Sequence, residues 1–250
     1  MQLKIKLVAA LGMATLALGA LLHAQQPAAG AQPGAKDPVA TLKQSLQEGL
    51  AKARQYEWIQ TTAISMKGEE KSRKTERCYY GADGKLQKVP LDEGQASSQK
   101  QGGGGRRGGR GGRVKQQIVE NKKDEITEYM QKAAALVQKY VPPSPEQIQA
   151  AKDAGRVAVN PQTGSAVNVV ISQYLQAGDK LTIGIDPAAS RVLGLNVDTF
   201  LDKPEDKVTL DVQMNTLPDG AVYAAQTTLD AKAKNIRVMI QNSGHKPLAR

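Results

Sequence analysis

The sequence predicts an α+β fold in which a curved antiparallel sheet, an open or half barrel of about nine strands, wraps two or three helices. Residues 56–91 and 167–242 alternate apolar and polar side chains with a period of two, which is typical of strands with one buried face. Apolar residues between these two regions recur every three or four positions, as they do in helices. Short turns separate the later strands, which favours an antiparallel meander.

The first 24 residues have the features of an export signal. Lys4 and Lys6 precede a mainly apolar run of 16 residues, Leu7–Leu22, and Leu22-His23-Ala24 fits a cleavage site. The run is shorter than the roughly 20 residues that cross a bilayer. We therefore expect an exported protein, periplasmic or secreted, with no transmembrane anchor after cleavage. The alternative is a segment that is retained as an anchor.

Residues 25–36 are predicted to be a disordered linker, and residues 37–250 a single α+β domain. The domain opens with a helix over 38–54, because Asp37 is a suitable N-cap and Pro38 a suitable first helical residue. This helix has an apolar stripe that consists of Val39, Leu42, Leu46 and Leu50.

Three strands are expected next, over 56–67, 71–80 and 85–91. Turn-forming residues separate them at Gly68-Glu69 and at Ala82-Asp83-Gly84. Trp58, in the first strand, shares a face with Ile64 and Met66. Its large ring serves either as a core anchor or as a surface that contacts a ligand.

A glycine- and arginine-rich segment at 95–117 is predicted to be a disordered loop. Its centre, Gln101–Arg113, contains eight glycines, which have no side chain to bury. The net charge of the chain is +10, and six positive residues lie between Lys100 and Lys115 without an acid among them. Four arginines of this loop form a candidate anion-binding site: Arg106, Arg107, Arg110 and Arg113. No aromatic residue is interleaved with them, which disfavours specific recognition of nucleic acid.

Helical periodicity returns after the loop. Asn121 can cap a helix over 122–141, which carries an apolar stripe and ends before Pro142. A third, shorter helix begins at the capping box Ser144-Pro145-Glu146-Gln147 and ends near Gly155. Because its residues are mostly Gln and Ala, we expect a surface or lid element rather than a core helix.

Six further strands complete the predicted sheet. They cover residues 167–174, 181–186, 192–201, 208–214, 222–230 and 236–242. Their alternation makes one face of the sheet apolar and the other polar. Nine strands spaced ~4.8 Å apart form a sheet roughly 43 Å wide, whereas a helix pair covers only about 20 Å.

This surplus of apolar sheet surface has three solutions. The sheet curls into a half-barrel around its helices and leaves an apolar cavity, it closes or folds into a fully packed core, or a partner covers it. The order of the elements favours the half-barrel. The residues expected to line its cavity are Trp58, Ile64, Met66, Tyr129, Leu136, Leu181, Ile183, Ile185, Leu193, Leu195, Val208, Leu210, Val212, Ile236 and Val238.

Few residues are available for catalysis. Cys78 is the only cysteine, which excludes an intrachain disulfide and a multi-cysteine zinc site, and we interpret it as a small, half-buried strand residue. His23 lies in the export signal, and His245 lies near the C-terminus, where fraying would leave it exposed. The sequence has no G-x-S-x-G motif and no phosphate-binding loop. It therefore predicts a non-enzymatic protein without a metal or cofactor.

Two segments carry a family resemblance. The hairpin that runs from Tyr56-Glu57-Trp58-Ile59 to Tyr80-Gly81-Ala82-Asp83-Gly84, and Leu181–Pro187 with its terminal Asp-Pro, follow an export signal and a helix. In this order of elements the chain resembles the LolA-like periplasmic lipoprotein carriers and their uncharacterised exported relatives. The resemblance implies an unclosed barrel with a helical lid and an apolar cavity for acyl chains. The chain differs from these carriers in having few aromatics and in its Arg-Gly-Gly loop.

The sequence thus leads to two functional hypotheses. The first is a binding protein that holds an apolar or lipid-like ligand in the cavity of the half-barrel, with the helix at 122–141 as its gate. The second is a cell-envelope interaction protein that contacts polyanions or anionic surfaces through the Arg-Gly-Gly loop. Salt dependence separates the two, because only the second depends on charge.

Overall fold

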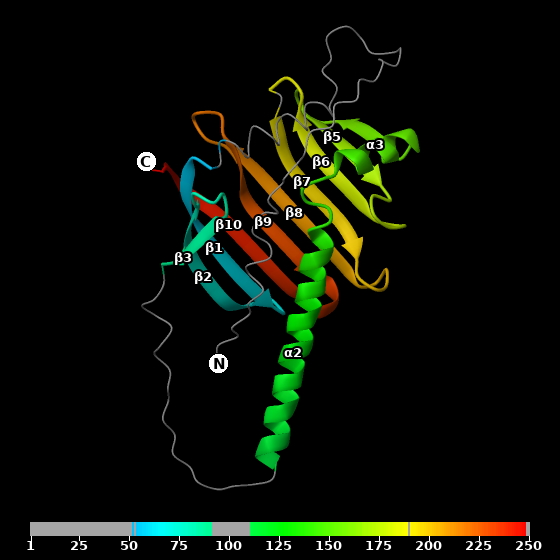
Figure 1. The fold of residues 1–250 in the computed structure, drawn as a ribbon. Coiled ribbons are helices and arrows are strands. Elements are labelled where there is room, and N and C mark those ends of the chain that lie inside the picture. Colours follow the sequence, from blue (N-terminus) through cyan, green and yellow to red (C-terminus); the bar gives the residue numbers. More distant parts are fainter. Residues whose placement is uncertain (1–51, 53, 92–110, 190, 249–250) are drawn as a thin grey trace.

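The computed structural model describes residues 52, 54–91, 111–189 and 191–248 (Figure 1). The export signal predicted at 1–24 and the linker at 25–36 lie outside these residues, as does nearly all of the helix predicted over 38–54. Most of the predicted disordered loop and three of the candidate anion-binding arginines, Arg106, Arg107 and Arg110, also lie outside them.

Ten strands form a single antiparallel sheet that does not close, which confirms the predicted α+β half-barrel. Their order across the sheet is β3-β2-β1-β10-β9-β8-β7-β6-β5-β4, so that β3 and β4 are the edges. The strands are β1 (Tyr56–Met66), β2 (Glu69–Tyr80), β3 (Leu86–Pro90), β4 (Val157–Pro161), β5 (Val167–Ser172), β6 (Lys180–Asp186), β7 (Arg191–Phe200), β8 (Lys207–Thr216), β9 (Val222–Ala231) and β10 (Ile236–Pro247).

The number of strands differs from the prediction, whereas their connection does not. The structure has one strand more than the nine expected, because β4 is a short edge strand that pairs only with β5 and leaves Val159 half exposed. Such a strand lacks the alternation of a buried face. The predicted meander of the last six strands is confirmed, and β1 joins it by pairing with β10, so that the first hairpin extends the sheet beyond the last strand.

The helices begin and end close to the predicted positions, with one exception. Helix α2 spans Gly111–Val137 and therefore starts within the segment 95–117 that was predicted to be disordered. Helix α3, Pro145–Asp153, has the predicted cap, in which the Ser144 hydroxyl accepts a hydrogen bond from the Gln147 backbone N–H. A short 3-10 helix, η2 (Lys232–Lys234), connects β9 to β10.

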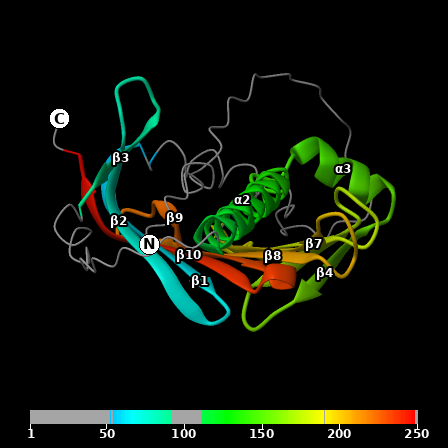
Figure 2. The same ribbon diagram turned by 90° about the horizontal axis from the view of Figure 1, so that it is seen from below.

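The sheet is curved, and α2 lies across its concave face (Figure 2). The main core is formed between this face and the helices, where Met130, Ala133 and Val137 of α2 are buried against strand residues. Helix α3 contributes Ile148 and Ala151 to the same core. Glu146, Gln149 and Lys152 of the same helix are exposed, so α3 lies at the surface as predicted, and only one face of it belongs to the core.

Buried hydrogen bonds fix the C-terminal end of α2 to the sheet. The Tyr140 hydroxyl donates to the Asp179 carboxylate at 2.5 Å and also contacts the Thr199 hydroxyl at 2.8 Å. Asp179 also accepts backbone N–H groups within the turn between β5 and β6, including those of Tyr174 and Leu175. Burial and the contact with Asp179 raise the pKa of Tyr140 well above its ordinary range, so the phenol stays protonated and can donate.

Two half-exposed contacts hold the middle of α2 against other turns at the same end of the strands. The Tyr129 hydroxyl donates to Asp206 at 2.5 Å in the turn between β7 and β8. The Lys234 ammonium binds Glu125 at 2.6 Å from η2. Helix α2 is therefore tied to three separate places on the sheet.

Candidate functional site

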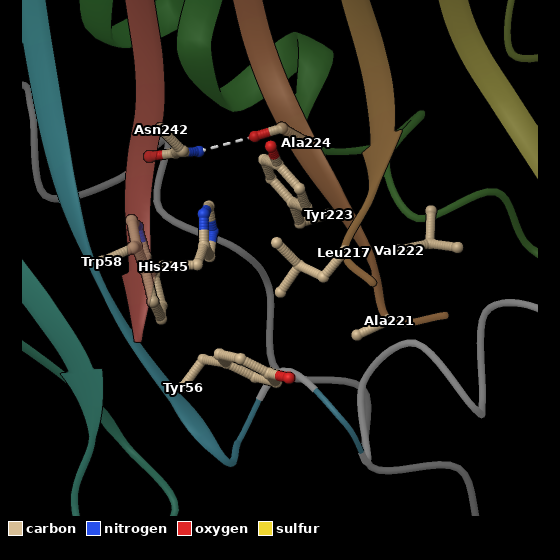
Figure 3. Close-up of a pocket in the computed structure, with 9 residues that line it drawn as sticks. All are labelled: Tyr56, Trp58, Leu217, Ala221, Val222, Tyr223, Ala224, Asn242 and His245. Carbon is tan, nitrogen blue, oxygen red and sulfur yellow. Dashed lines mark hydrogen bonds between the residues drawn. The ribbon is translucent and has the colours of Figure 1, made fainter. Parts of the chain in front are cut away.

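A small pocket lies on the concave side of the sheet, where β1 and β9 begin and β10 ends. Its volume is about 30 Å³. Figure 3 shows Trp58 and His245 side by side, with Leu217 and Tyr223 across from them. The lining residues are Tyr56, Trp58, Leu217, Ala221, Val222, Tyr223, Ala224, Asn242 and His245. With the exception of Asn242 and His245, these side chains are apolar or aromatic, so the walls suit an apolar ligand.

Three aromatic rings that line this pocket contact one another, and a fourth ring, Tyr80, packs against Trp58 outside the lining. The rings of Trp58 and His245 stack at 6.0 Å between centroids with an interplanar angle of 14°. Tyr223 lies 4.0 Å from His245, and Tyr80 lies 5.9 Å from Trp58 on the other side. Burial among these rings lowers the pKa of His245, which is therefore predominantly neutral near pH 7. The predicted fraying of His245 was wrong, because this residue is packed within β10.

A β-bulge explains why His245 faces the pocket. Glu57 pairs with Lys246 and Ile59 pairs with Ser243, so that Trp58 faces two residues of β10 rather than one. The extra residue is Gly244, whose φ of +62° favours glycine. The bulge shifts the alternation of β10 by one position and turns His245 toward Trp58. The glycine before a histidine at the end of an alternating strand was the available sequence signal.

Hydrogen bonds hold the rim of the pocket in place. The Tyr56 hydroxyl donates to Asp219 at 2.6 Å, in the turn that leads from β8 to β9. The other Asp219 oxygen accepts the Ala221 backbone N–H at 3.0 Å. These contacts lower the pKa of Asp219, with the Tyr56 hydrogen bond as the largest cause. Asn242 ties β10 to β9 by donating to the Ala224 carbonyl at 2.8 Å (Figure 3).

Beyond Trp58, the same face of β1 and β2 is polar although it is buried. Gln60, Thr62 and Glu76 are only 5%, 2% and 3% exposed. Gln60 donates to Asn242 at 3.2 Å and accepts from Lys88 at 2.6 Å. Burial lowers the pKa of Lys88.

Three buried polar atoms in this region have no hydrogen-bond partner among the described residues. They are Trp58 Nε1, Thr62 Oγ1 and Glu76 Oε2. An unsatisfied buried polar group costs about 1–3 kcal/mol. Their clustering on two adjacent strands distinguishes this end of the concave face from the apolar core under α2.

Cys78 lies next to Trp58 on β2 and is fully buried rather than half-buried as predicted. Burial raises its pKa to about 11. Since the thiolate is the reactive form, this environment disfavours a nucleophilic role.

Solved structures of other proteins provide a comparison for this arrangement. A LolA superfamily protein from Nitrosomonas europaea is 8% identical over 82% of this chain and 94% of that chain, with a TM-score of 0.33. A protein described as an outer membrane lipoprotein-sorting protein domain, from Vibrio parahaemolyticus, is 10% identical over 85% of this chain and 94% of that chain, with a TM-score of 0.40.

A DUF1329 family protein from Desulfovibrio piger is 12% identical over 85% of this chain and 94% of that chain, with a TM-score of 0.39. No protein-family profile and no curated protein matches the chain.

Most of the predicted cavity residues lie in the main core. Ile64, Leu181, Ile183, Ile185, Val208, Leu210, Val212, Ile236 and Val238 are buried there, and Met66, Tyr129, Leu136 and Leu195 pack against them. Trp58 is the predicted residue that lines the pocket. A role of the others in ligand binding stays a prediction.

Leu193 was assigned to the wrong position on its strand. Gly194 pairs with Gly184, whereas Val192 pairs with Ile185, so Leu193 is an extra residue in a bulge of β7. Val192, 6% exposed, is the core residue instead. Alternation alone does not reveal a bulge, since one inserted residue reverses the faces beyond it.

Two kinds of feature are absent from the described residues. No group of three or more His, Cys, Asp or Glu residues among them could hold a metal ion. None of the helices in this part of the chain combines the length and apolar character of a membrane span. Arg113, the remaining candidate anion-binding residue, lies in the first turn of α2.

Proposed function

We propose that this protein is an exported, non-enzymatic binding protein that holds an apolar or lipid-like ligand on the concave side of its half-barrel. The observation that carries the proposal is the pocket between β1, β9 and β10, which has aromatic and aliphatic walls and lies on the concave face of an unclosed sheet. A ligand bound there gains about 25 cal/mol for each Å² of apolar surface removed from water.

The place proposed for the ligand differs from the region beneath α2. The apolar strand residues under this helix already contact its side chains, including Met130 and Val137. At the Trp58 end, by contrast, the pocket has free volume. Sites for small molecules usually measure about 300–1,000 Å³. We therefore propose that a ligand chain enlarges the pocket by displacing the half-buried Leu217 and the turn that follows it.

The binding can be measured through Trp58, which is the only tryptophan of the chain and lines the pocket. Titration with the apolar dye N-phenyl-1-naphthylamine should increase dye fluorescence and change Trp58 emission. Leu217→Phe adds a ring opposite His245 and should weaken dye binding by about tenfold, or ~1.4 kcal/mol. Met239→Phe adds a similar ring on the opposite face of β10 and serves as the matched control.

A second variant keeps the test valid if Leu217→Phe does not fold. His245→Ala removes one aromatic wall and widens the pocket, so it should change dye affinity while Met239→Phe does not. The proposal is contradicted if the folded wild-type protein does not increase dye fluorescence, or if all three variants bind the dye as the wild type does.

A further inference from the structure

We propose that the concave face over β1 and β2 contains a head-group site, formed by Trp58, Thr62 and Glu76, that selects an uncharged group able both to donate and to accept hydrogen bonds. A hydroxyl or an amide has this property. The inference rests on the proposed function and specifies the class of its ligand as an uncharged amphiphile.

The first observation is the combination of deep burial and missing partners. Trp58, Thr62 and Glu76 are 6%, 2% and 3% exposed. Trp58 Nε1, Thr62 Oγ1 and Glu76 Oε2 nevertheless have no hydrogen-bond partner in the part of the chain that the structure describes. Buried polar side chains in native proteins are nearly always paired, so three exceptions in one region indicate partners supplied by another molecule.

The second observation is that the three residues belong to one patch. Gln60 pairs directly with Glu76 across β1 and β2, and Trp58 and Thr62 are two positions away from Gln60 on either side. Because strand side chains alternate between faces, all four lie on the face that carries Ile64. Trp58 also forms a wall of the apolar pocket. The patch and the pocket are therefore contiguous, as the two ends of an amphiphile require.

The hydrogen-bonding capacity of the three groups defines the head group. The indole N–H of Trp58 can only donate, and the free carboxylate oxygen of Glu76 accepts. Thr62 can do both. A bound group must therefore offer an acceptor to Trp58 and a hydrogen to Glu76, which a hydroxyl or an amide provides.

The free oxygen of Glu76 disfavours an anionic head group. The ammonium of Lys74 binds the other Glu76 oxygen at 2.5 Å, so the carboxylate already has a counter-charge. The ammonium of Lys88 donates to Gln60 at 2.6 Å. A ligand carboxylate or phosphate would face Glu76 Oε2 without a hydrogen to offer it, and the two would repel each other.

The test compares two probes with the same acyl chain, monolauroylglycerol and laurate, each titrated below its aggregation concentration with Trp58 emission as the readout. Wild-type protein should bind monolauroylglycerol more tightly than laurate. Thr62→Val removes the hydroxyl but retains the shape of the side chain. It should weaken monolauroylglycerol binding by about two- to tenfold and leave laurate binding unchanged.

Thr61→Val is the matched control, since Thr61 is the neighbouring residue on the opposite face of β1. It should leave the affinity for both probes unchanged. Thermal unfolding of each variant provides a second readout. Because Thr62 Oγ1 has no partner to lose, Thr62→Val should not lower the midpoint, and a loss of affinity then reports recognition rather than misfolding.

The outcomes separate this inference from the proposed function. Equal affinity of the two probes for the wild type, or unchanged monolauroylglycerol binding by Thr62→Val, overturns the head-group site and leaves apolar binding in place. Absence of binding by either probe and by N-phenyl-1-naphthylamine overturns both.

Discussion

His245 is the titratable side chain at the centre of the pocket, and its packing makes a prediction about pH. The groups around it are the rings of Trp58, Tyr223 and Tyr56, with Asp219 one hydrogen bond further away. Burial lowers the pKa of His245 in the folded protein from its ordinary 6.5. As the pH falls through about 6.5, the unfolded chain takes up a proton that the folded chain resists, and folding stability decreases.

His245→Gln removes this proton linkage. Urea unfolding at about pH 7.5 and about pH 5.5 should show a smaller loss of unfolding free energy for the variant than for the wild type. Asp219, whose pKa is lowered, is present in the variant and in the wild type, so it does not cause the difference between their losses of unfolding free energy. Equal losses in both proteins would show that His245 is not buried in solution.

At the scale of single elements, bulges separate what the sequence predicts from what it does not. Alternation placed β6, β8 and most of β10 with the correct buried face, since apolar residues occupy every second position. It misplaced Leu193 and missed the pocket position of His245, because each lies at a bulge. The polar patch was also missed, since Thr62 and Glu76 occupy core-facing positions that alternation reserves for apolar residues.

The bulge of β7 allows a matched pair of substitutions. Gly194 and Gly184 pair with each other on adjacent strands. A Cβ atom on Gly194 would lie 2.8 Å from the carbonyl oxygen of Val212, whereas one on Gly184 would come no closer than 3.5 Å to the Asn168 side chain. Gly194→Ala therefore forces β7 away from β8 and should lower the unfolding free energy by about 1–3 kcal/mol.

Gly184→Ala is the control and should leave the unfolding free energy unchanged or slightly increased, because alanine restricts the unfolded chain more than glycine does. Urea unfolding of the two variants measures the difference. If both lose the same stability, the close approach of β7 and β8 is not maintained in solution.

For the whole molecule, the width of the sheet was the quantity that led from sequence to fold. Too many strands for the available helices indicated a curved, unclosed sheet, and the ten-stranded half-barrel agrees with this. The order of the strands across the sheet was harder to predict from the sequence. The β1–β10 pairing links residues 170 to 191 positions apart, from Met66↔Ile236 to Tyr56↔Pro247, and no local pattern encodes such a contact. That pairing brings Trp58 to His245, so the pocket depends on topology rather than on a motif.

The two functional hypotheses also differ at this scale, because they place binding in different parts of the chain. Deletion of residues 95–110 removes Arg106, Arg107 and Arg110 and leaves α2 intact, since α2 begins at Gly111. If the concave face binds the ligand, the deletion should change monolauroylglycerol affinity by less than about twofold at both ~20 mM and ~150 mM salt.

Binding to phosphatidylglycerol vesicles, if it uses the arginines, should be lost on deletion. In the wild type it should weaken as salt shortens the Debye length from over 20 Å to about 8 Å. Replacing the same three arginines with glutamine retains the length of the segment and separates charge from chain length. A loss of monolauroylglycerol affinity in both altered proteins would mean that the segment contributes to the lipid site, and that one binding region rather than two serves this protein.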